Sequence, residues 1–158
     1  MKGFGILEIV IAVSIISATI FSLSFVFIIS SRLEEASLNK IRANFLAEEG
    51  LEATRFLRDQ SWATNLGGLS IGTTYYLSFN AVNSVWSINT SNPGLIDNLF
   101  LRKVTAENVC RNDSYDIVSS CGTLDPDTKK INVSVEWLER GSTATISAST
   151  YLSDIFDN

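Results

Sequence analysis

The chain has 158 residues, of which 46% are hydrophobic and 18% are charged, and its net charge is −5. This composition excludes bulk disorder, and the length suffices for one domain with a hydrophobic core. Because the sequence has no histidine and no Lys/Arg cluster, it lacks the most frequent general base and zinc ligand and the basic surface of nucleic-acid-binding proteins.

The first predicted element is a membrane-spanning helix. Residues 9–29 are 21 residues without a charge, about 31 Å long as a helix and enough to cross a bilayer. A cleaved signal peptide is the weaker interpretation, because its apolar core is usually about 7–15 residues and ends at a small-residue cleavage site. Lys2 favours an N-terminus inside the cell, which places the residues after Arg32 outside the cytoplasmic membrane.

Two features of this helix suggest contact with other molecules. Glu8 stands at the head of the apolar run, and an ionised carboxylate in hydrocarbon costs roughly 2.5–3.5 kcal/mol. Either Glu8 lies at the level of the lipid headgroups, or another molecule supplies its partner. Ser14, Ala18 and Ser22 share one face, and small residues at this spacing allow a second helix to approach closely. Chance occurrence of Ser and Ala is the alternative for this stripe.

The helical pattern continues into a polar segment without turn signals. One stripe of the continuation is apolar and consists of Leu38, Ile41, Phe45, Ala53, Phe56 and Leu57. We therefore predict one helix from Phe4 to Trp62, with Gly50 as its weakest point. The outer half of such a helix must place its apolar stripe against the C-terminal part of the chain.

From Ala63 onward, β-branched and aromatic residues replace helix formers. The strand candidates are Thr73–Phe79, Ser84–Ile88, Leu99–Val109, Ile131–Trp137 and Thr143–Leu152. The last two alternate apolar and polar residues, which predicts an antiparallel hairpin with one buried and one solvated face. We expect an α+β fold in which a four-stranded antiparallel sheet lies on the helix.

Cys110 and Cys121 bound a segment of 12 residues. Outside the cytoplasm a disulfide is the expected state, and closing a loop of this length stabilises by about 3 kcal/mol in the chain-entropy model. Two free thiols or a metal pair are the alternatives, although no further ligands lie nearby. In DPDTKK, Asp125 and Asp127 supply too few oxygen ligands to bind calcium, and the two lysines that follow oppose a cation. We therefore predict an Asp-Pro turn there.

The opening residues MKGFGILE carry a family resemblance. Lys2-Gly3, then Phe4, then Glu8 before an apolar helix resemble the class III signal of type IV prepilins and pseudopilins. In that family a prepilin peptidase cuts after the glycine, and the same enzyme N-methylates the exposed phenylalanine. The resemblance implies cleavage between Gly3 and Phe4 and methylation of Phe4. It also implies that Glu8 faces the Phe4 amine of a neighbouring subunit in a filament, a pair that is strong only when both partners are present.

Over residues 2–30 the resemblance rests on a specific motif, and over the rest of the chain it rests only on the expected arrangement of helix and strands. It implies a leader (1–3), a membrane and filament-core helix (4–30), an amphipathic helix (31–62) and a β head with the cysteine loop (63–158). The stretch AEEGLEATRFLRD is similar to the stalk of minor pilins. The chain departs from the family in two places. Phe25 stands near the position at which many pilins have a proline in the membrane helix, and Gly5 replaces the hydroxylated residue that commonly follows the phenylalanine.

The predicted function is that of a minor pilin of a bacterial type IV pilus. The subunit would sit in the cytoplasmic membrane and then in an extracellular or periplasmic filament. Its partners would be the peptidase, other pilin subunits and the inner-membrane assembly platform. Alternatives are a pseudopilin of type II secretion and a membrane-anchored binding domain that does not polymerise. Ten acids and six bases from Ala63 onward disfavour DNA capture. We expect no enzyme activity and no cofactor or metal, because no catalytic constellation can be assembled.

Overall fold

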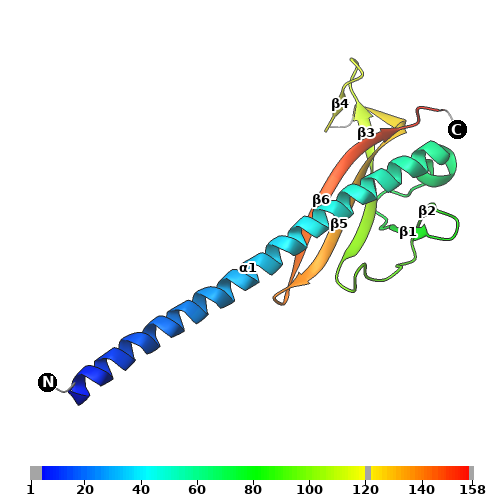
Figure 1. Cartoon of the computed structure of the whole chain (residues 1–158). Helices are drawn as coiled ribbons and strands as arrows, with labels where there is room; N and C mark the ends of the chain where they lie inside the picture. The colour runs from blue at the N-terminus through cyan, green and yellow to red at the C-terminus, as the bar shows by residue number, and fades with distance from the viewer. Residues whose placement is uncertain (1–4, 120–121, 157–158) are drawn as a thin grey trace. The chain divides into compact units, whose positions relative to one another are not determined.

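The computed structural model describes residues 5–119 and 122–156 and falls into two units, residues 1–39 and 40–158 (Figure 1). A long N-terminal helix, α1 (Ile6–Gln60), is followed by a π-helical turn, η1 (Ala63–Gly67). The strands are β1 (Tyr76–Asn80), β2 (Val85–Asn89), β3 (Leu101–Arg111), β4 (Ile117–Val118), β5 (Thr123–Glu139) and β6 (Ser142–Ser153). The predicted α+β fold, with a long helix against an antiparallel sheet, is confirmed.

Helix α1 is continuous over 55 residues, as the absence of proline before Pro93 predicts. Near its C-terminus two donors converge on one backbone carbonyl. The backbone N–H of Ser61 and the side-chain amide of Asn65 both donate to the carbonyl of Leu57, at 3.2 and 2.9 Å. The helix therefore ends by capping from the residues that follow it.

The main sheet has four antiparallel strands in the order β4-β3-β5-β6. Strands β5 and β6 form the predicted hairpin, with an unbroken register from Thr128 opposite Ser153 to Glu139 opposite Ser142. Its two-residue turn, Arg140-Gly141, has φ values of 52° and 82°. Positive φ at both central residues matches the right-handed twist of the flanking strands.

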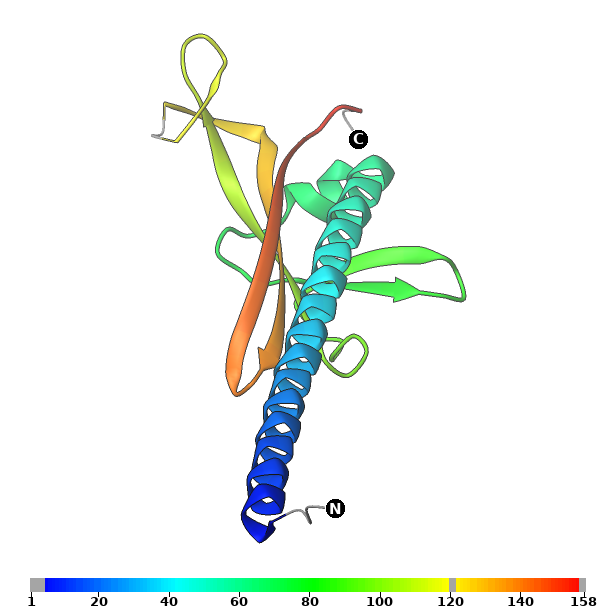
Figure 2. The ribbon, with the colours of Figure 1, turned by 60° about the vertical axis from the view of Figure 1, so that its left-hand side comes forward.

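Strands β1 and β2 belong to a separate two-stranded sheet, drawn in green in Figure 2. A bridge between Tyr75 and Val104 joins this hairpin to β3, with two backbone hydrogen bonds of 2.8 Å. The four-stranded sheet was predicted, but its membership differs from the strand candidates. The two-residue strand β4 carries no alternation that the sequence reveals, and it takes the place at the edge beside β3.

The predicted Asp-Pro turn at DPDTKK is present as a local feature, in which the backbone N–H of Asp127 donates to Asp125 Oδ1 at 3.0 Å, but it does not interrupt the strand. These residues lie inside β5, where the register with β3 jumps between Asn108, opposite Lys129, and Val109, opposite Asp125. Residues 126–128 therefore have no partners on β3 and form a bulge. Pro126 is tolerated there because a bulge removes the need for a ladder hydrogen bond.

The predicted packing face of the helix is only partly right. Ala53 and Leu57 are buried, but Leu38, Ile41, Phe45 and Phe56 are exposed by 49%, 49%, 65% and 41%. The buried face consists mainly of small residues: Ala43, Ala47, Gly50, Ala53, Thr54 and Leu57. Small side chains allow the helix backbone to lie close to the sheet. The close packing gained in this way outweighs the apolar area that the predicted stripe of larger residues would have buried.

Two clusters of apolar residues form the core of residues 40–158. In the first, Leu57 and Ala53 contact Val104, Ile131 and Val133 of the central strands. In the second, Ala43 and Ala47 lie against Phe100, Val135 and Trp137. The inward-facing residues predicted for β5, which are Ile131, Val133, Val135 and Trp137, are all buried.

Candidate functional site

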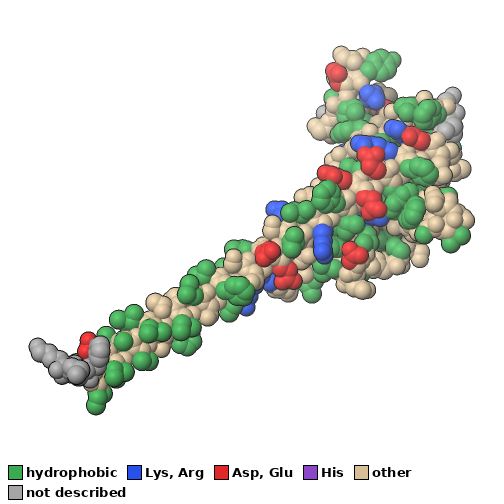
Figure 3. Space-filling view, viewed as in Figure 1, with side chains coloured by type: hydrophobic (Ala, Val, Ile, Leu, Met, Phe, Trp, Pro, Cys, Tyr) green, Lys and Arg blue, Asp and Glu red, His purple; other side chains and the backbone are tan. Residues whose placement is uncertain are grey.

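The apolar part of α1 is an extended surface that the rest of the described structure does not cover. It contains an 18-residue window of mean hydropathy 2.5, none of it buried inside the structure. Its large side chains are exposed by 41% at Ile29 to 84% at Ile6. Figure 3 shows hydrophobic side chains along this stretch of helix. The core helix of a soluble protein is mostly buried, whereas this helix segment is not. Its exposed apolar surface is compatible with a membrane anchor.

Glu8 lies in the first turn of α1, where its backbone N–H donates to the carbonyl of Gly5 at 3.0 Å. A carboxylate at this end of a helix is favourable, because the unpaired N–H groups give it a partial positive charge. The carboxylate is exposed, so it remains accessible to a partner from another molecule. Gly3 and Phe4, the predicted cleavage and methylation sites, lie outside the described residues.

The stripe of small residues is also exposed. Ser14 Oγ donates to the carbonyl of Val10 at 2.7 Å, and Ser22 Oγ donates to the carbonyl of Ala18 at 2.9 Å. Both hydroxyl protons are therefore used within the helix. A second helix can approach this face without burying an unpaired hydroxyl donor.

The cysteine loop can be followed on one side only. Cys110 lies near the end of β3, opposite Val118 of β4 and Leu124 of β5. No cysteine among the described residues is free. Cys121 lies outside the described residues, so its pairing with Cys110 stays a prediction.

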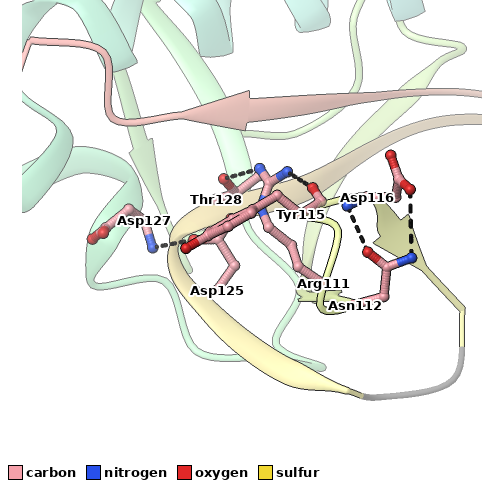
Figure 4. A network of polar contacts seen from close by, with 7 residues as sticks. All are labelled: Arg111, Asn112, Tyr115, Asp116, Asp125, Asp127 and Thr128. Carbon is pink, nitrogen blue, oxygen red and sulfur yellow. Dashed lines mark hydrogen bonds and ion pairs between the residues drawn. The ribbon is translucent and has the colours of Figure 1, made fainter.

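A polar network supports this end of the sheet (Figure 4). Arg111 donates from Nε to Asp125 Oδ2 at 2.6 Å, from Nη1 to the carbonyl of Tyr115 at 2.8 Å and from Nη2 to Thr128 Oγ1 at 3.3 Å. Asn112 Oδ1 accepts the backbone N–H of Asp116 at 2.9 Å. The network ties the β3–β4 loop to the bulge of β5.

The electrostatics of the network favour an ionised Asp125. Burial by itself raises the pKa of Asp125, but hydrogen bonds from Arg111, Thr128 and the Asp127 backbone, together with the Arg111 charge, hold it below 3.8. A shallow cavity of about 560 Å³ lies beside this pair and is lined by Tyr115, Leu124 and Pro126 among others. Each of the three Arg111 nitrogens donates one hydrogen bond within the network, which fixes the guanidinium against the cavity wall.

Sequence reasoning missed the Arg111 network and also the burial of Arg102. Both depend on pairings across strands that no local pattern reveals. Among the described residues, no three His, Cys, Asp or Glu side chains come together in a group able to hold a metal ion. Comparisons with known protein families, with characterised proteins and with solved structures give no match to this chain.

Proposed function

We propose that this chain is a minor pilin of a type IV pilus, anchored in the cytoplasmic membrane and then assembled into a filament through its N-terminal helix. The observation that carries the proposal is the helical segment of residues 9–29, which carries no charge and whose large side chains are not buried by any residue that the structure describes. Lipid covers such a surface before assembly, and helices of neighbouring subunits cover it afterwards.

The N-terminal motif gives the proposal its assembly step. Cleavage after Gly3 by a prepilin peptidase creates a new amine at Phe4, which the same enzyme methylates. Glu8 lies four residues further along and is exposed. In a low-dielectric filament core this carboxylate pairs with the Phe4 amine of a neighbouring subunit, and an unpaired carboxylate there is strongly unfavourable. The pair therefore selects correctly placed subunits.

Terminal mass spectrometry of the protein extracted from native membranes tests this function. We expect a chain that begins at Phe4 and carries one added methyl group. The matched control is Gly3→Ala, which should remain uncut in the same cells. A wild-type chain that still begins at Met1, in cells with active prepilin peptidase, would contradict the proposal and favour a membrane-anchored domain that does not polymerise.

A further inference from the structure

Strand β6 is an edge of the main sheet that has none of the features that usually protect an edge. In the order β4-β3-β5-β6, the strand that pairs with it among the described residues is β5. It is 12 residues long, and its sequence STATISASTYLS contains no charge and no proline. Its register with β5 is unbroken from Ser142 to Ser153, so no bulge bends the edge away. Natural edge strands are commonly short, charged or interrupted, because a long uncharged edge is a template for pairing with another chain.

The outward-pointing backbone groups of β6 belong to alternate residues. The two-residue turn at Arg140-Gly141 makes Glu139 and Ser142 a hydrogen-bonded pair, so the even-numbered residues of β6 bond to β5. The backbone N–H of Asp154 continues this pattern and donates to the carbonyl of Asp127 at 2.8 Å. The residues whose N–H and C=O groups point outward are therefore the ones with exposed side chains: Thr143, Thr145, Ser147, Ser149 and Tyr151.

The apolar row of β6 is covered only in part. Ala144, Ile146 and Ala148 lie at the margin of the second core cluster and are half-buried. The corresponding residues of the neighbouring strand β5, Val133 and Val135, are fully buried. A strand placed beside β6 would cover this margin. The edge therefore offers both backbone hydrogen bonds and apolar area to an added strand.

The sequence of β6 is complementary to itself in one antiparallel register, which is centred on Ser147. In this register the residues of two copies meet as Ser147 opposite Ser147, Thr145 opposite Ser149, Thr143 opposite Tyr151 and Ile146 opposite Ala148. Each pair joins two hydroxyl groups or sets a large side chain against a small one, combinations that stabilise neighbouring strands. The register also places the outward-pointing backbone groups of the two copies opposite one another.

Charges at the two ends of β6 select the same register. Arg140 precedes the strand and Asp154 follows it, at equal distances along the chain from Ser147. Antiparallel pairing about Ser147 therefore brings Arg140 of each copy to Asp154 of the other. Centring the pair on either neighbouring residue would place Arg140 opposite Leu152 or Phe156, which are apolar.

We propose that β6 pairs with β6 of a second copy of this chain, antiparallel and centred on Ser147, with an ion pair of Arg140 and Asp154 at each end. Residues 40–60 of α1 belong to the same unit as β6, so the pairing turns these helix segments of the two copies in opposite directions. For a membrane-anchored chain, the contact therefore joins subunits on opposed surfaces and not neighbours in one membrane. The pairing does not depend on the proposed function.

Sedimentation equilibrium of the full chain in density-matched micelles, with micelles in excess over protein, tests the pairing. A single pair of strands is a small interface, so we expect a monomer–dimer equilibrium with a dissociation constant of about 0.1 mM. Ser147→Lys sets two ammonium groups opposite each other at the centre and should weaken association about tenfold. The matched control is Ser87→Lys, the same substitution at an exposed position of β2, which should associate as the wild type does.

Reversal of the end charges tests the register without relying on a loss of stability. Arg140→Glu and Asp154→Arg should each weaken self-association about tenfold, because like charges then meet at both ends. An equimolar mixture of the two variants should associate as tightly as the wild type. In the mixed pair, the introduced glutamate meets the introduced arginine at one end, and the native pair of charges remains at the other.

Three outcomes would contradict the proposal. A mixture that associates no more tightly than either variant alone would overturn the register. Association that Ser147→Lys leaves unchanged would overturn β6 as the contact. A wild type that stays monomeric at about 1 mM would overturn pairing with a second copy in favour of a strand from a different protein.

Discussion

Gly50 lies where α1 packs tightly against the sheet. A Cβ added there would stand 2.7 Å from Val133 Cγ1 and 3.1 Å from Arg102 Cδ. Val133 is fully buried, so a shift of its side chain would disturb the core around it. Glycine at this position is therefore required by packing, although it weakens the helix by about 1 kcal/mol relative to alanine.

We predict that Gly50→Ala destabilises residues 40–158 by about 1 kcal/mol. The overpacking cost of about 1–3 kcal/mol exceeds the gain in helix propensity. Denaturant unfolding of the full chain in micelles measures the difference. Gly68→Ala is the control, because the nearest atom to its added Cβ is 3.9 Å away. A rise in stability for Gly50→Ala would show that the sheet yields to the added methyl group.

A second residue-scale prediction concerns Asp125, whose side chain is 14% exposed and whose pKa is held below 3.8. Because the folded pKa is depressed, the ionised carboxylate contributes stability that is fully present above pH 3.8 and is lost as the pH falls through the lowered pKa. We expect Asp125→Asn to reduce the free energy of unfolding by about 1–2 kcal/mol at pH 7. The wild type and the variant should converge only as the pH falls below the lowered folded pKa of Asp125, and a pH-independent difference would contradict the assignment.

At the scale of elements, α1 has one face of small residues against the sheet and another of large residues in solvent. We predict that Leu57→Ala lowers the free energy of unfolding by about 2–5 kcal/mol, because Leu57 is 1% exposed and a cavity remains. Phe45→Ser should change it by less than about 0.5 kcal/mol, since Phe45 is 65% exposed. Thermal unfolding of the two variants under matched conditions checks this contrast. A large decrease in the free energy of unfolding for Phe45→Ser would instead support the packing face that the sequence predicts, which includes Phe45.

Some features of these elements could be predicted from the sequence, and others could not. The alternation of Ile131, Val133 and Val135 predicts β5 and its buried face, because a period of two has one structural solution. The face of α1 could not be predicted by counting large apolar residues, since close approach selects Ala47 and Gly50 over Phe45. The bulge at residues 126–128 is set by pairing with both β3 and β6, which a local Asp-Pro signal does not contain. The guanidinium contacts of Arg102 and Arg111 likewise join residues far apart in the chain.

At the scale of the whole molecule, the two units differ in how they bury apolar side chains. Residues 40–158 bury a core of their own, whereas no large apolar side chain of residues 6–29 is buried by the part of the chain that the structure describes. We predict that Glu8→Ala inserts into the membrane as the wild type does, because it removes a charge from the apolar segment. If the proposed pair with the Phe4 amine forms, the variant should nevertheless reduce the amount of subunit in sheared filaments about tenfold or more, because the carboxylate of that pair is removed.

Immunoblots of the membrane and sheared-filament fractions measure both effects in one strain. Glu34→Ala is the matched control, because Glu34 is an exposed acid on the same helix outside the apolar run. An unchanged filament fraction for Glu8→Ala would contradict the role of the carboxylate in assembly.

The small-residue face of α1 also determines when the protein can fold during synthesis. Ala47 and Gly50 leave the ribosome early, but their contacts Val133, Val135 and Trp137 belong to the last strands of the chain. The apolar segment of residues 6–29 thus leaves the ribosome long before residues 40–158 can close their core. Until β5 is synthesised, the nascent chain exposes a helix face whose partners are still being translated. Chaperone protection is most needed in this interval.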